Sequence, residues 1–131
     1  MRKLLAAPFL LTCSMATAAP PSGERLAYLV GCINCHHQTP KEIINAPPLV
    51  IVQAYSLPEF QKLMKTGITR TGRDMLAASS LMGIVAKEQF SHFTEDEVVA
   101  VYNFLHDSWN MDRAKKEEAK IPFLYKPEPH K

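Results

Sequence analysis

Residues 31–37, with the sequence GCINCHH, decide how the rest of the chain is interpreted. Two cysteines, Cys32 and Cys35, are separated by two residues, and His36 follows the second cysteine directly. Three kinds of chemistry use a Cys-x-x-Cys pair: a redox disulfide, half of a zinc site, and the covalent attachment of haem. Each kind needs a different structure around the motif, so the surrounding sequence can distinguish between them.

The surrounding sequence disfavours zinc and a redox disulfide. A structural zinc site takes about four Cys or His ligands, whereas Cys32, Cys35 and His36 give at most three, and no second pair follows at the spacing of a zinc finger. A thioredoxin-like motif follows a buried strand, whereas this one follows a predicted helix at residues 23–31. Haem attachment fits directly, because each thiol can bond one haem vinyl group and the next residue, His36, can bind the iron.

Residues 1–19 have the pattern of a secretory signal peptide. Two basic residues precede a short apolar run, which small residues follow. Cleavage is expected after Ala18 or Ala19. The alternative, an uncleaved membrane anchor, is disfavoured because the apolar run is short for a bilayer, and no membrane span is expected after cleavage. Since c-type haem is attached outside the bacterial cytoplasm, the signal agrees with haem attachment and predicts a periplasmic protein.

Cleavage leaves one small domain with balanced charge. We expect the signal peptide at 1–19, one domain at 20–112, and a loosely held, charged and proline-rich tail at 113–131. The signal removes two basic and no acidic residues, so the 15 Lys and Arg residues fall to 13, equal to the 13 Asp and Glu residues. This balance gives no reason to expect a nucleic-acid partner.

Helical patterns dominate the domain, and the predicted fold class is all-α. The clearest helices are expected at residues 56–66, with a stop at Gly67, and at residues 94–109. Each begins with a capping box, in which Ser or Thr is followed three residues later by Glu: Ser56 with Glu59, and Thr94 with Glu97. A weaker helix at 75–90 is expected to be interrupted by Gly83. Residues 36–55 are expected to form a loop with a short extended piece at Leu49–Val52.

The chain resembles the small class I c-type cytochromes of bacteria. Four features match in order: CINCH after a short helix, prolines soon after it, a region with methionines, and a final helix that ends VYNFL. The resemblance covers residues 23–109. It implies three to five helices wrapped around one covalently bound haem c, with the first and last helices crossing beside it. It also implies that Tyr28 meets Phe104 at this crossing.

The resemblance also implies a second axial ligand to the haem iron. In many such proteins a methionine lies a dozen or so residues before the cap of the final helix, and Met82 occupies this position. Met75 is the second choice. Met64 is placed on the apolar face of its helix, Met111 follows the last helix, and His92 lies just before a helix cap. A methionine ligand would raise the reduction potential, because a thioether favours ferrous iron.

The ring of His36 needs an acceptor for its second N–H. In the family this acceptor is a proline carbonyl about a dozen residues further on. Pro47 and Pro48 are both candidates, and the sequence does not separate them. His37 is expected to be a loop residue and not a ligand.

Four basic residues cluster between segments that the resemblance places near the haem: Lys62, Lys65, Arg70 and Arg73. Such a cluster either steers an acidic redox partner toward the haem or is an ordinary solvated face. The sequence leaves these two interpretations open.

These observations predict a periplasmic electron carrier with one c-type haem and no catalytic site. It would pass single electrons between a dehydrogenase and a respiratory acceptor, alone or as the dehydrogenase's cytochrome subunit. The expected partners are redox proteins, namely a dehydrogenase, an oxidase or another cytochrome. The alternative is a haem enzyme or gas-binding haem protein with an open sixth position on the iron, in which Met82 is not a ligand.

Overall fold

The computed structural model describes residues 21–36 and 46–120. The expected signal peptide, His37 and the last part of the expected tail lie outside these residues. Every regular element in the described ranges is helical, and one isolated bridge joins Ile68 to Asp74. The all-α prediction is confirmed for this part of the chain. None of the described helices is both long enough and apolar enough to cross a membrane.

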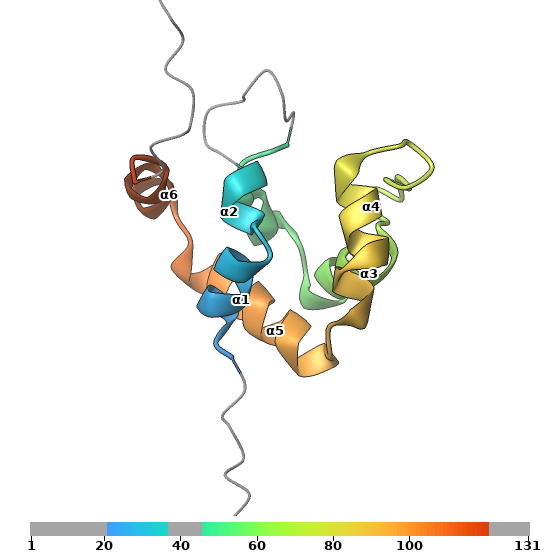
Figure 1. Ribbon diagram of the computed structural model, residues 1–131, viewed down its shortest axis with the longest axis horizontal. Helices are drawn as coiled ribbons and strands as arrows, with labels where there is room; N and C mark the ends of the chain where they lie inside the picture. The colour runs from blue at the N-terminus through green and yellow to red at the C-terminus, as the bar shows by residue number, and fades with distance from the viewer. Residues whose placement is uncertain (1–20, 37–45, 121–131) are drawn as a thin grey trace, which may run out of the picture.

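The described residues contain six α-helices, two 3-10 helices and one π-helical segment. In chain order they are α1 (Gly23–Leu29), α2 (Cys32–Cys35), η1 (Leu49–Ala54), α3 (Leu57–Thr66), α4 (Leu81–Glu88), η2 (Phe90–His92), α5 (Glu95–Asn103), the π-helical η3 (Phe104–Ser108) and α6 (Met111–Glu118). In Figure 1, α1 and α2 lie on one side of the molecule, α3 and α4 lie on the other, and α5 runs along the base. The number of helices exceeds the expected three to five, because α2 is a separate turn and α6 was not anticipated.

The crossing of α1 and α5 brings two helix backbones into direct contact. A Cβ atom on Gly23 would lie 1.8 Å from the carbonyl oxygen of Ala100. No side chain fits this gap, so a glycine is required where the two helices cross. Ala27 on α1 and Val101 on α5 are fully buried in the same contact.

Both predicted capping boxes are present, and they set where α3 and α5 begin. Glu59 accepts a hydrogen bond from the backbone N–H of Ser56 at 2.8 Å. At α5, the Glu97 carboxylate accepts from the N–H of Thr94 at 2.8 Å, and the Thr94 hydroxyl accepts from the N–H of Glu97 at 3.2 Å. Gly67 ends α3 with φ of 75°, as predicted for a helix-terminating glycine.

The prediction that Gly83 interrupts a helix is wrong, because Gly83 lies inside α4. A Cβ atom there would lie 2.3 Å from the backbone nitrogen of Leu76 and 2.4 Å from the carbonyl carbon of Met75. Gly83 therefore lets the preceding turn pack directly on the helix. The expected extended piece after Pro48 is also different, because those residues form the 3-10 helix η1.

Residues that were expected to be a loose tail form α6, which packs on the domain. Ala114 is buried, and the guanidinium of Arg113 pairs with Glu24 of α1. The same guanidinium lies 4.9 Å from the centre of the Phe104 ring, a cation–π distance. The sequence did not indicate this helix, because it buries only one small side chain and so has no apolar pattern. Arg113 makes its main contacts with the domain, through its stem and its charge.

Tyr28 makes a different contact from the one that the family resemblance implied. Its side chain is exposed and bonds to Glu117 of α6, while the Phe104 ring packs on Trp109 with ring centres 5.9 Å apart. Partial burial, together with the adjacent Glu117 carboxylate, raises the pKa of Tyr28 to about 12. In place of the predicted contact with each other, Tyr28 and Phe104 each contact a residue of α6, namely Glu117 and Arg113.

Gly23→Ala is expected to lower the free energy of unfolding by about 3 kcal/mol, because the new methyl group must push α1 away from α5. Gly72→Ala is the matched control: Gly72 has φ of 81° and nothing within 4 Å of an added Cβ. It should lose only about 1 kcal/mol, from backbone strain. Denaturant unfolding measures both values, and equal losses would refute the close helix crossing.

Candidate functional site

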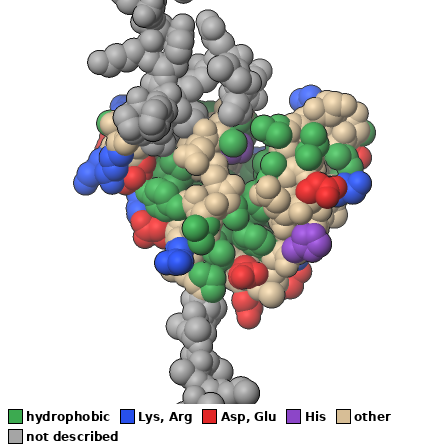
Figure 2. Space-filling model, viewed as in Figure 1, with side chains coloured by type: hydrophobic (Ala, Val, Ile, Leu, Met, Phe, Trp, Pro, Cys, Tyr) green, Lys and Arg blue, Asp and Glu red, His purple; other side chains and the backbone are tan. Residues whose placement is uncertain are grey.

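A cavity of about 310 Å³ opens between the α2–η1 side and the α3–α4 side of the molecule. In Figure 2 hydrophobic side chains surround this hollow. Among the described residues that line it there is no Asp, Glu, Lys or Arg. The cavity is therefore suited to a large apolar group that reaches solvent at one edge.

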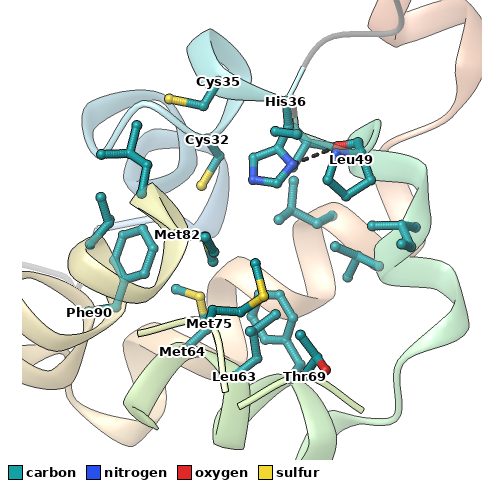
Figure 3. A pocket seen from close by; sticks show the side chains of 18 of the residues that line it. Cys32, Cys35, His36, Leu49, Leu63, Met64, Thr69, Met75, Met82 and Phe90 are labelled. Carbon is teal, nitrogen blue, oxygen red and sulfur yellow. Dashed lines mark hydrogen bonds between the residues drawn. The ribbon is translucent and has the colours of Figure 1, made fainter. Parts of the chain in front are cut away.

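The local backbone sets Cys32, Cys35 and His36 along one wall of the cavity. Gly31, with φ of 79°, ends the first helical segment, and the single turn α2 then carries both cysteines. His36 caps that turn, its N–H donating to the Cys32 carbonyl at 3.0 Å. All three side chains line the cavity (Figure 3). The structure thus brings together the three residues that the motif singled out.

The ring of His36 is oriented by a proline carbonyl. Its Nδ1 lies 2.6 Å from the carbonyl oxygen of Pro47. Because a carbonyl can only accept, Nδ1 carries the hydrogen in the neutral ring, and Nε2 is the nitrogen whose lone pair would bind a metal. The carbonyl of Pro48 instead accepts from the N–H of Ile51 at 3.0 Å, within η1. Of the two candidates that the sequence left open, Pro47 makes the contact.

Three methionines line the cavity, and two of them are the predicted ligand candidates. Figure 3 shows Met75 and Met82 across the open space from His36, with Met64 near them. Met64 is buried, as its place on α3 predicted, although it also forms part of the cavity wall. The other two candidates, His92 and Met111, are exposed and lie outside this wall.

A closed turn positions Met75 and leads into α4. The carboxylate of Asp74 accepts from the N–H groups of Leu76 and Ala77, both at 2.9 Å. The N–H of Ser80 then closes the turn on the carbonyl of Met75, also at 2.9 Å. Asp74 was not among the residues predicted from the sequence, although Asp side chains commonly bond the backbone two residues further on and so mark turns.

The thiol of Cys32 lacks the properties of a redox-active cysteine. Burial raises its pKa to about 12. The thiol is therefore protonated at neutral pH, whereas reactive cysteines have a lowered pKa and are thiolates. This agrees with the sequence argument against a thioredoxin-like motif. Within the described ranges, no three His, Cys, Asp or Glu side chains are grouped to hold a metal ion by themselves.

Two members of the basic cluster are used inside the fold. The ammonium of Lys65 donates to the carbonyls of Ser91 and Phe93. The guanidinium of Arg70 donates to the carbonyl of Ala54 at 2.7 Å. None of the four basic residues of the cluster lines the cavity. The solvated-face interpretation is therefore only partly correct, because Lys65 and Arg70 join helices and loops to one another.

Gly83→Ala is expected to push the Met75–Ser80 turn off α4, since the new Cβ would overlap the backbone of that turn. Amide hydrogen exchange at Ser80, whose N–H closes the turn, should accelerate about tenfold or more. Gly72→Ala is the control, because that position has open space around it. Unchanged protection of Ser80 in Gly83→Ala would contradict the packing described here.

The site has to be interpreted from its own residues. Comparison with protein-family models, with curated proteins and with solved structures gave no match. The side chains that meet in the cavity, and the bonds that orient them, are therefore the basis on which a function can be inferred.

Proposed function

We propose that this chain is a class I c-type cytochrome that carries single electrons in the periplasm. One observation carries the proposal: Cys32, Cys35 and His36 meet on one wall of an apolar cavity, and methionine thioethers lie across from them. In this proposal the two thiols form thioether bonds to one haem, and His36 binds its iron. The motif, its turn and the expected export signal all agree with covalent haem attachment.

The donor set and the cavity wall both fit such a group. When bound, haem would supply one-electron exchange between ferric and ferrous iron. The carbonyl of Pro47 holds the His36 ring in the tautomer that leaves Nε2 able to coordinate. Apolar side chains such as Leu49, Val52 and Phe60 exclude water from the cavity wall. A dry pocket of this kind is one of the factors that set a haem potential.

Met82 is the proposed second axial ligand. It lies in the first turn of α4, packs against the buried core and lines the cavity. Met75, in the turn that Gly83 holds against α4, is the other candidate. A thioether in this position would favour the ferrous state and close the iron to outside ligands.

The chemistry of the wall favours a carrier over a haem enzyme with an open sixth position. Enzymes that activate oxygen or peroxide place polar donors on the distal side of the haem. In the described part of the chain, the cavity wall holds no Arg or Lys, and its one histidine is His36. The expected partners of such a carrier are a dehydrogenase, an oxidase or another cytochrome.

Expression of the full chain in a periplasm that attaches c-type haem should give a red protein with one haem per chain. The ferric protein should show the charge-transfer band of methionine ligation. Met82→Ala should abolish this band and leave a high-spin iron, whereas Met75→Ala should retain it. Met111→Ala is the control, because Met111 is exposed on α6 and does not line the cavity.

Two results would reject the proposal. Protein that leaves the periplasm without covalent haem would reject the cofactor. A high-spin iron in the unmodified protein, binding carbon monoxide immediately after reduction, would retain the haem and favour the enzyme or gas-binding alternative. Loss of the band in Met75→Ala alone would assign the ligand to Met75 instead of Met82.

A further inference from the structure

We propose that this protein exchanges electrons through an uncharged apolar collar, formed by Leu76, Leu81 and Ile84, which docks against an uncharged apolar patch on a partner redox protein. This inference rests on the proposed function, because it assigns the partner surface of the same site. It replaces the acidic partner that the basic cluster had suggested with a partner of different chemistry.

The collar is an exposed group of large apolar side chains at the cavity mouth. The relative exposures of Leu76, Leu81 and Ile84 are 38%, 53% and 45%. Leu81 and Ile84 are three residues apart and therefore neighbours on α4. The backbone of Leu76 packs directly on Gly83 of the same helix. Leu81 also lines the cavity, so the collar begins where the cavity opens. Adjoining exposed apolar residues of this kind indicate an interaction site.

No charge lies within the segment that forms the collar. Residues 75–86 read MLAASSLMGIVA, and the nearest charged residues in the sequence are Asp74 and Lys87. The Asp74 carboxylate is occupied by two backbone N–H groups, and Lys87 lies 3.9 Å from Glu88. Ile51, which also lines the cavity, is another exposed apolar residue. A charged partner surface would lose its hydration at the collar without gaining an opposite charge. An uncharged apolar surface would not have this cost, and it would bury the apolar side chains of the collar.

The basic cluster gives a charged partner little to bind at this edge. Lys65 donates to the carbonyls of Ser91 and Phe93, and Arg70 donates one bond to the carbonyl of Ala54. Lys65 also lies 4.0 Å from Glu95, which offsets its charge. None of the four basic residues lines the cavity, and the segment that forms the collar has no charged residue, so this edge of the cavity matches an uncharged partner surface.

The turn that presents Leu76 is held by backbone hydrogen bonds at both ends. It is closed by the bond from Ser80 N–H to the Met75 carbonyl and anchored by the bond from Met75 N–H to the Gly67 carbonyl at 3.0 Å. A preorganised surface loses little conformational entropy when a partner docks. Because no charges take part, the rate of docking should not depend on ionic strength.

Electron self-exchange between oxidised and reduced copies of the haem-loaded full chain tests this inference. The second copy is the probe, because it carries the same uncharged apolar surface. Nuclear magnetic resonance line widths in mixtures of the two oxidation states give the rate constant. For the unmodified protein it should change less than about twofold between low salt and about 0.5 M salt.

Ile84→Lys should lower this rate constant at low salt by about tenfold, and the rate should then rise with salt, because two docking copies now oppose positive charges. Leu81→Lys should act in the same direction. Met111→Lys is the matched control, since Met111 is 47% exposed but lies on α6. It should behave like the unmodified protein, and both Ile84→Lys and Met111→Lys should retain the unmodified absorption spectrum.

Several outcomes would contradict the docking role of the collar, and they can be distinguished from failure of the proposed function. A rate for the unmodified protein that rises steeply with salt, or an Ile84→Lys variant that matches Met111→Lys, would overturn it. A stable dimer in sedimentation, or binding to neutral lipid vesicles that Ile84→Lys abolishes, would assign the collar to a second copy or to a membrane instead. Absence of haem, or a high-spin spectrum, would reject the carrier itself, and the collar's role with it.

Discussion

The contact between the backbones of α1 and α5 is the constraint on which the rest of this structure depends. Gly23 meets the carbonyl of Ala100 at a distance that admits no side chain, so the two helices cross in one place only. α1 is followed directly by Gly31 and α2. The place where α1 crosses α5 therefore determines where Cys32 and Cys35 lie. α5 packs against α3 as well, so the same helix links the two sides of the cavity.

The two walls of the cavity are built in different ways. The wall that carries His36 follows from local structure, namely one helical turn, its cap and the bond to the Pro47 carbonyl. The wall that carries Met82 depends on close backbone packing, because Gly83 lets the preceding turn lie against α4. The uncharged turn at residues 75–80 packs closely on α4. This packing shapes the cavity and leaves apolar side chains exposed at the edge of the cavity. The proposed haem site and the proposed partner surface are therefore parts of one arrangement.

Local signals in the sequence were sufficient for the starts of α3 and α5, and for placing Cys32, Cys35 and His36 on one turn. The capping boxes at Ser56 and Thr94 and the Cys-x-x-Cys-His motif act through bonds between near neighbours, so each is readable from spacing alone. What failed depended on contacts between distant segments. α6 is held by one cation on two aromatic rings. Pro47 and not Pro48 binds the His36 ring, because the Pro48 carbonyl accepts from Ile51 at the start of η1. Such contacts leave no periodic pattern in the chain.

The central claim is that one haem is bonded to both cysteines. Mass spectrometry of the peptide of residues 26–41, prepared by trypsin from protein isolated from its native cells, tests this claim most directly. The account predicts that this peptide carries the mass of one haem through Cys32 and Cys35 together. A peptide with free thiols, or with a disulfide between the two cysteines, would contradict it.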